Sequence, residues 1–200
     1  MTKGIFEDRE HALEANYFRQ QDARLLDQLR KNAKLDDIAV ALADKLKVDN
    51  PDLLLKAREI GITADTAPAF FLAPLVQVAW AEGTPGEAER KAVLRLAEER
   101  GVETSSTAYI QLEQWLASRP SKELFDTSLE VLRSGFSVLP RVERIERIDR
   151  LVDACRKVAF AAGRGLAPLL GVGKTVSRAE ADAVEVIEAE LRKPVIPHPK

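Results

Sequence analysis

Apolar residues recur every three or four positions along most of the chain, and polar residues fill the positions between them. This spacing places the apolar side chains on one face of an α-helix. No segment alternates apolar and polar residues over enough positions to form a β-strand. The pattern therefore predicts an all-α protein. It predicts helices at about residues 5–33, 35–46, 51–60, 67–81, 87–100, 106–118, 122–134, 140–162 and 178–191.

Residues typical of helix ends support this division. Asp49 or Asn50 lies before Pro51, which is the order of a capping residue followed by a proline at the first helical position. Ser177 and Glu180 have the spacing of a capping box ahead of the last helix. We therefore expect the chain to enter both helices at these residues.

The stretch from 67 to 81 is mainly apolar and contains Pro68 and Pro74. It is shorter than the roughly 20 residues that cross a bilayer. A helix that is apolar on all sides belongs in a protein core. We therefore expect one buried helix here, with Thr66 as its cap and with the prolines near its start or at a kink.

One phrase occurs twice in the chain. Residues 77–83 read Gln-Val-Ala-Trp-Ala-Glu-Gly, and residues 157–163 read Lys-Val-Ala-Phe-Ala-Ala-Gly. Each copy ends an apolar helix at a glycine and precedes an amphipathic helix that opens on an acidic turn, so we expect two similar helix pairs packed as one unit. Four aromatic residues of these apolar stretches are predicted to lie in the core: Phe70, Phe71, Trp80 and Phe160.

Composition narrows the classes of function. The formal net charge of the 200 residues is −2 with both signs interspersed, whereas nucleic-acid binding needs a clustered basic face. Cys155 is the only cysteine, so no internal disulfide can form, and its place in an apolar stripe predicts a core residue. Residues 1–10 lack the apolar segment of a signal peptide, so we expect a cytoplasmic protein, with association at the periphery of a membrane complex left open.

The first copy of the repeat leads into a recognisable pattern. Residues 78–83 (Val-Ala-Trp-Ala-Glu-Gly) precede residues 87–90 (Glu-Ala-Glu-Arg), which open a helix. This resembles the signature of the TerB-like family, named for a tellurite-resistance protein, and the resemblance covers about residues 64–193. It implies a compact all-helical bundle with an internal helix-pair repeat. It also suggests a link to envelope stress, as the family's name indicates.

The resemblance further implies acidic residues that hold a divalent cation, and the matching positions are Glu82 and Glu89. In the second copy Ala162 replaces the first acid and only Glu180 remains, distant in sequence, which is a small set for a cation that needs six or more oxygens. Glu87, Glu89 and Glu180 can instead be first-turn acids, each stabilised by the helix dipole by about 0.3–1 kcal/mol. Apart from this cation, no cofactor is expected.

The segment before the repeat carries a second resemblance. Over about residues 5–69 it is similar to the start of the zeta subunit of alphaproteobacterial ATP synthases, with matches at 6–14, 30–32 and 42–46. That family's N-terminal segment inserts into the catalytic head and blocks ATP hydrolysis. The residues that would contact a partner are Phe6, Arg9, Leu13 and Tyr17. The few core positions in the middle of the helix over 5–33 leave a coiled-coil homodimer open.

The remaining motifs favour binding over catalysis. Residues 171–175 (Gly-Val-Gly-Lys-Thr) resemble a phosphate loop, but Pro168 stands where that motif needs a glycine. An anion could still bind at the start of the last helix, and the candidate residues are Gly173, Lys174 and Ser177. His11 and His198 lie at opposite ends of the chain, without the neighbours of a zinc site or a hydrolytic relay. We therefore expect no enzyme.

These observations define three regions: a helical N-terminal arm over 1–63, a TerB-like bundle over 64–193, and an extended proline-rich tail over 194–200. The function they favour is that of an interaction or scaffold protein, which binds a protein partner through the arm and the loop at 163–176. The alternatives are an inhibitor of ATP synthase and a divalent-cation sensor.

Overall fold

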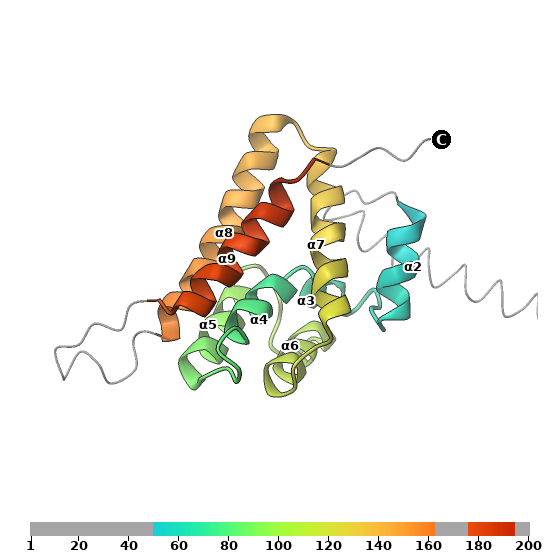
Figure 1. The fold of residues 1–200 in the computed structure, drawn as a ribbon. Helices are drawn as coiled ribbons and strands as arrows, with labels where there is room; N and C mark the ends of the chain where they lie inside the picture. The colour runs from blue at the N-terminus through green and yellow to red at the C-terminus, as the bar shows by residue number, and fades with distance from the viewer. Residues whose placement is uncertain (1–49, 163–175, 195–200) are drawn as a thin grey trace, which may run out of the picture. The chain divides into compact units, whose positions relative to one another are not determined.

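The periodic pattern yields helices throughout the part of the chain that the structure, a computed structural model, describes. That part comprises residues 50–162 and 176–194, and in it the chain forms eight helices and no strand, which confirms the all-α prediction (Figure 1). The helices are α2 (Pro51–Glu59), α3 (Ala67–Phe70), α4 (Ala73–Ala79), α5 (Glu87–Glu98), α6 (Thr107–Ala117), α7 (Lys122–Ser137), α8 (Arg141–Ala162) and α9 (Arg178–Arg192).

Several predictions fall on residues outside the described ranges. These are the helices at 5–33 and 35–46, most of the loop at 163–176, and the tail beyond residue 194. The candidate partner contacts are among them: Phe6, Arg9, Leu13 and Tyr17. The contacts of the chain divide it between residues 37 and 38, and the second unit, 38–200, contains every described residue.

The helices begin and end where local chemistry satisfies their free backbone groups. The side-chain oxygen of Asn50 accepts hydrogen bonds from the backbone N–H groups of Asp52 at 3.0 Å and Leu53 at 3.4 Å, which confirms the predicted cap of α2. Gly61 follows the helix with φ +85°, a conformation that favours glycine. α2 contacts α7, so this part of the predicted arm packs on the bundle.

The apolar stretch at 67–81 forms two short helices, where the sequence predicted one. α3 ends at Phe70 and α4 begins at Ala73, with Pro74 in its first turn. In a continuous helix the Phe70 carbonyl would accept a hydrogen bond from residue 74, but proline has no N–H. The buried hydroxyl of Ser128 on α7 donates to this carbonyl at 2.9 Å instead. A side chain of another helix therefore satisfies the group that the proline leaves free.

Thr66 also differs from the prediction. It holds the N-cap position of α3, but its side chain makes no capping hydrogen bond to that helix. The Thr66 hydroxyl instead accepts a hydrogen bond from the backbone N–H of Thr63 at 2.9 Å, within the preceding turn. The hydrogen bond between Thr63 and Thr66 therefore stabilises the turn before α3, and α3 itself has no side-chain cap.

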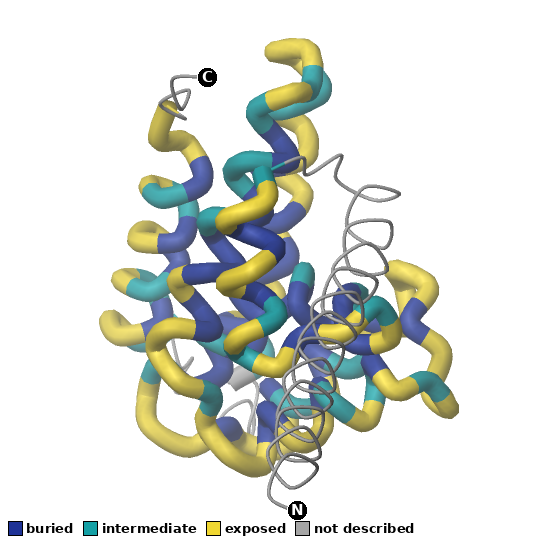
Figure 2. The backbone as a smooth tube through the Cα atoms, turned by 90° about the vertical axis from the view of Figure 1, so that its right-hand side faces the viewer, coloured by how far each residue is buried: buried dark blue, intermediate teal, exposed yellow. Residues whose placement is uncertain are grey.

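α4 is the central helix of the described residues. Leu75, Val76 and Val78 are 0% exposed, and α4 contacts α5, α6, α7, α8 and α9. Burying a side chain of this kind stabilises a fold by about 1.5–3 kcal/mol. Figure 2 shows the buried positions gathered on the inward sides of the helices, with the exposed positions facing outward.

The two copies of the repeat lie in the pairs α4 and α5, and α8 and α9. The pairs pack reciprocally, because α5 contacts α8 and α9 contacts α4. Trp80 is buried as predicted, and its indole N–H donates to the Trp115 carbonyl on α6 at 2.8 Å. The core prediction for Phe160 is wrong, because this side chain is 61% exposed. α6 covers α4 beside Trp80, whereas the helices that contact α8 are α4, α5, α7 and α9.

Candidate functional site

Two glutamates hold equivalent places at the starts of α5 and α9. A Glu89 carboxylate oxygen accepts a hydrogen bond from the Gly86 backbone N–H at 2.5 Å, ahead of α5. A Glu180 oxygen accepts one from the Ser177 N–H at 3.0 Å, and the Ser177 hydroxyl accepts one from the Glu180 N–H at 3.2 Å. The capping box at the start of α9 is therefore complete, as predicted. At the start of α5 only the hydrogen bond to the glutamate is present, because the N-cap residue Gly86 has no side chain to accept the second one.

Both carboxyl groups are buried, and they lie next to each other. Glu89 is 6% exposed and Glu180 is 1% exposed. Burial raises the pKa of Glu89, and the Gly86 hydrogen bond opposes this in part. The negative charges of Glu180 and Glu82 raise this pKa further. Neighbouring carboxylates repel each other, so the Glu180 charge favours the protonated form of Glu89.

One oxygen of this pair has no internal partner. Oε1 of Glu180 is buried without a hydrogen bond among the described residues. A protonated Glu89 can donate to it, and so can a cation placed between the two groups, since a bare buried carboxylate oxygen is costly. We call Glu89 and Glu180 the acid pair, and this pair is a place in the described fold that can hold a proton or a cation.

The acid pair differs from the predicted set of Glu82 and Glu89. Glu82 is exposed in the turn between α4 and α5, and it acts on Glu89 through its charge. Glu180 is distant from Glu89 in sequence, but folding brings the two carboxyl groups together. The sequence did contain the signal, because Glu89 and Glu180 each stand three residues after the N-cap of the second helix of a repeat copy.

The donor set suits only a cation that keeps water ligands. Among the described residues, no group of three or more His, Cys, Asp or Glu side chains is placed to hold a metal ion. Glu89 and Glu180 each use one oxygen for a cap and have the other available. Mg²⁺ is commonly bound through one or two carboxylates with several waters, whereas Ca²⁺ takes six to eight oxygens. The pair therefore fits Mg²⁺ better than Ca²⁺.

Phe160 lies on the outer side of α8 between two hollows. The first, of about 450 Å³, lies between α5 and α8 and includes Ala88, Ala92 and Lys157 in its lining. The second, of about 230 Å³, lies between α8 and α9 and includes Val176. Phe160 borders both hollows. We call this side chain with its two hollows the Phe160 surface.

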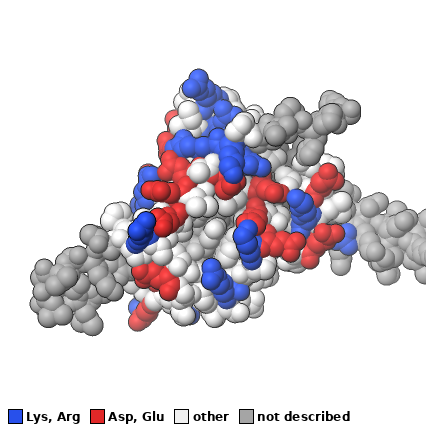
Figure 3. Space-filling view, in the orientation of Figure 1, with Lys and Arg blue, Asp and Glu red and all other residues white. Residues whose placement is uncertain are grey.

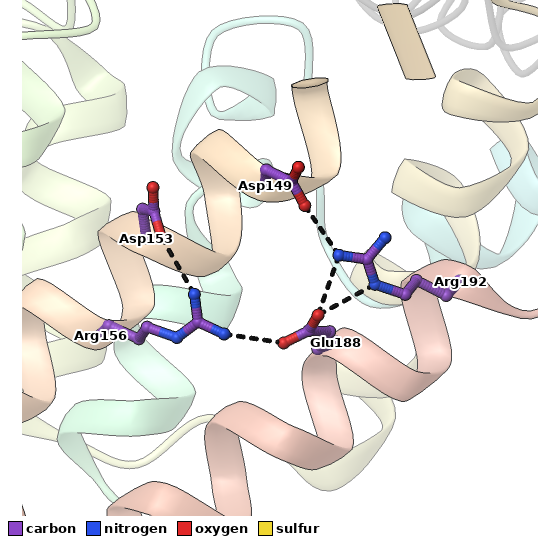
Figure 4. A network of polar contacts seen from close by, with 5 residues as sticks. All are labelled: Asp149, Asp153, Arg156, Glu188 and Arg192. Atoms are coloured by element: carbon purple, nitrogen blue, oxygen red, sulfur yellow. Dashed lines mark hydrogen bonds and ion pairs between the residues drawn. The ribbon is translucent and has the colours of Figure 1, made fainter. Parts of the chain in front are cut away.

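An ion-pair network holds α9 against α8 beside this surface (Figure 4). Arg156 on α8 pairs with Asp153 at 3.1 Å and reaches Glu188 on α9 at 3.0 Å. Arg192 on α9 pairs with Glu188 at 2.9 Å and with Asp149 on α8 at 2.7 Å. Its hydrogen bonds to these two carboxylates raise the pKa of Arg192. Such exposed pairs each stabilise a protein by about 0–1 kcal/mol, so the network mainly fixes the register of the two helices.

The remaining sequence candidates have ordinary roles or lie outside the described residues. Cys155 is fully buried, as predicted, and burial raises the pKa of its thiol to about 12, so it is not a reactive thiolate at neutral pH. Ser177 uses its backbone N–H on Glu180, which leaves that group unavailable to the predicted anion. Gly173, Lys174 and both histidines lie outside the described residues.

Neither known proteins nor the charge distribution of the surface indicates a function for this chain. Models of protein families, curated proteins and solved structures contain no match to this chain. Among the described helices, none is long and apolar enough to cross a membrane. Acidic and basic side chains are mixed over the face shown in Figure 3. A functional interpretation therefore depends on the acid pair and on the Phe160 surface.

Proposed function

We propose that this protein is a non-enzymatic interaction protein built on a TerB-like bundle, and that a protein partner binds at the Phe160 surface. The observation that carries the proposal is the exposure of Phe160, at 61%, between two hollows. Aromatic side chains that fill or border pockets commonly dominate the energy of protein interfaces. The aromatic residue at the equivalent position of the first copy, Trp80, is buried, so the exposure of Phe160 is not shared by the two copies of the repeat.

The chemistry around Phe160 indicates the kind of partner. The first hollow is lined by alanines and by Lys91, Arg95 and Lys157. A partner segment with an apolar side chain flanked by carboxylates complements this lining. The resemblance to the TerB-like family suggests a cytoplasmic role in envelope stress.

The Phe160 surface is tested by capture of partners from a lysate that includes solubilised membranes. We expect the tagged wild-type chain to retain a partner that Phe160→Ala fails to retain. Ile110→Ala is the matched control, because Ile110 is 48% exposed on α6 and lies outside both hollows. Both variants should melt within about 2 °C of the wild type, since each changes an exposed side chain. Equal recovery of the partner by Phe160→Ala would overturn the proposal.

A divalent-cation sensor is the second candidate, and the unpartnered Glu180 oxygen beside Glu89 is the observation that favours it. When bound, Mg²⁺ would neutralise both carboxylates and join the starts of α5 and α9. We expect Mg²⁺ to raise the melting temperature of the wild type relative to chelator, and to have no effect on Glu180→Gln. The Glu82→Ala variant should keep most of the response, since Glu82 is exposed. Identical melts with chelator, Mg²⁺ and Ca²⁺ would eliminate this function.

A further inference from the structure

A separate hollow of about 600 Å³ opens between α3, α7, α8 and the C-terminal end of α5. This volume lies within the range of pockets that hold small ligands. Most of its floor is apolar and is formed by Phe71, Leu72, Val102, Leu132, Phe136 and Leu151. Its rim carries the charged residues Glu99, Arg100, Arg147, Arg150, Asp153 and Lys157.

Two of the four rim cations are compensated by neighbours on their own helix. Arg147 pairs with Glu143 at 3.4 Å, and Arg150 pairs with Glu146 at 3.4 Å. These carboxylates lie one helical turn away on α8 and outside the lining of the hollow. Arg147 and Arg150 therefore contribute little uncompensated charge to the rim.

Both rim carboxylates are compensated in the same way. Glu99 pairs with Arg95 at 3.7 Å, and Asp153 pairs with Arg156 at 3.1 Å. Neither arginine lines this hollow. The negative charge at the rim is therefore neutralised from outside.

Arg100 and Lys157 have no carboxylate partner in the described part of the chain. The Arg100 guanidinium donates to the Leu96 backbone carbonyl at 2.9 Å, a neutral acceptor. Lys157 makes no hydrogen bond or ion pair there, and it stands on α8 facing both this hollow and the neighbouring one. Two cations that lack a carboxylate partner among the described residues thus border an apolar floor.

We propose that this hollow binds a single-chain amphiphile with an anionic head group. The apolar floor removes the alkyl chain from water, at about 25 cal/mol for each Å² of apolar surface buried. The head group lies at Arg100 and Lys157, where a carboxylate or phosphate gains charge-assisted hydrogen bonds. A cationic head group would meet two like charges without compensation. The site is separate from the acid pair, and it shares only Lys157 with the Phe160 surface.

Calorimetric titration of the full chain with dodecanoate, below its micellar concentration, tests the site. We expect saturable binding of dodecanoate, no binding of acetate, and at least tenfold weaker binding of dodecyltrimethylammonium. Dodecyl phosphate in a parallel titration shows which anionic head group binds more tightly. Absence of saturable binding by both anionic amphiphiles, or equal affinity for the cationic one, would overturn the proposal.

Matched variants separate this hollow from other apolar surfaces. The double variant Arg100→Gln, Lys157→Gln should weaken dodecanoate binding at least tenfold. The control double variant Arg119→Gln, Arg141→Gln removes the same amount of charge from positions outside this hollow, and it should change the affinity less than twofold. Methyl NMR signals of Val102 and Leu132 should shift on titration in the wild type. Shifts confined to Ala88, Ala92 and Ala161 would place the ligand in the hollow beside Phe160 and refute the assignment.

Discussion

Glu89 holds its proton more tightly in the folded protein than in the unfolded chain. Burial raises its pKa above the ordinary value of 4.5, and the charges of Glu180 and Glu82 act in the same direction. A group with a raised folded pKa stabilises the fold fully below its unfolded pKa, and this contribution is lost as the pH rises through the folded pKa. Glu89 therefore makes the free energy of unfolding fall as the pH rises above about 4.5.

The substitution Glu89→Gln removes this dependence. The amide keeps an acceptor for the Gly86 N–H and adds a donor for the unpartnered Glu180 oxygen. We expect the variant to be more stable than the wild type at pH 7 by about 1 kcal/mol, the typical contribution of one hydrogen bond, and its stability to vary less between pH 5 and 7. Urea unfolding at both pH values measures the change.

Glu87→Gln is the matched control on the same helix. Glu87 is exposed, and its hydrogen bond to Lys91 lowers its pKa, so its contribution to the pH dependence has the opposite sign. We expect no gain in stability from this variant at pH 7. Loss of stability at pH 7 in Glu89→Gln would show that the acid pair is ionised and compensated, as a bound cation would require.

At the scale of elements, the break between α3 and α4 depends on one hydroxyl of α7. Ser128 donates to the Phe70 carbonyl, which Pro74 cannot satisfy, and the site is buried. We expect Ser128→Ala to lower the free energy of unfolding by about 1–3 kcal/mol, because it leaves a buried carbonyl without a partner. Ser137→Ala is the control, because the hydroxyl of Ser137 donates to the Ser134 carbonyl at the end of the same helix, where both residues are only partly buried. This variant should lower the free energy of unfolding by less than about 0.5 kcal/mol. Urea unfolding measures both changes, and equal decreases in the two variants would contradict this role of Ser128.

The elements were predictable where their causes are local. Asn50 and Ser177 mark the starts of α2 and α9 because a capping side chain bonds to its own next turn. The division of 67–81 into two helices was harder to predict, because a proline can be accommodated as a kink or as a break. The partner that favours the break, Ser128, is 58 residues away from Phe70.

At the scale of the whole molecule, burial and proximity depend on contacts between distant segments. Trp80 and Phe160 each stand between two alanines in the sequence, but α6 packs against α4 and accepts the Trp80 hydrogen bond, and Phe160 is exposed. Glu89 and Glu180 share a position in the repeat, but their contact requires both helix starts to meet. The all-α fold could therefore be predicted from periodicity, whereas the acid pair and the Phe160 surface could not be predicted as sites. The resemblance of residues 5–69 to the ATP synthase zeta subunit stays a prediction.

The division of contacts between residues 37 and 38 leads to a prediction for the whole chain. A fragment of residues 38–200 keeps every described helix, so we expect circular dichroism to show its helical signal and a melting temperature within about 3 °C of the full chain. If partner binding depends on the Phe160 surface, the fragment should capture the same partner, and Phe160→Ala in the fragment should abolish capture. A folded fragment that captures nothing would instead place the partner site in residues 1–37, as the second resemblance implies.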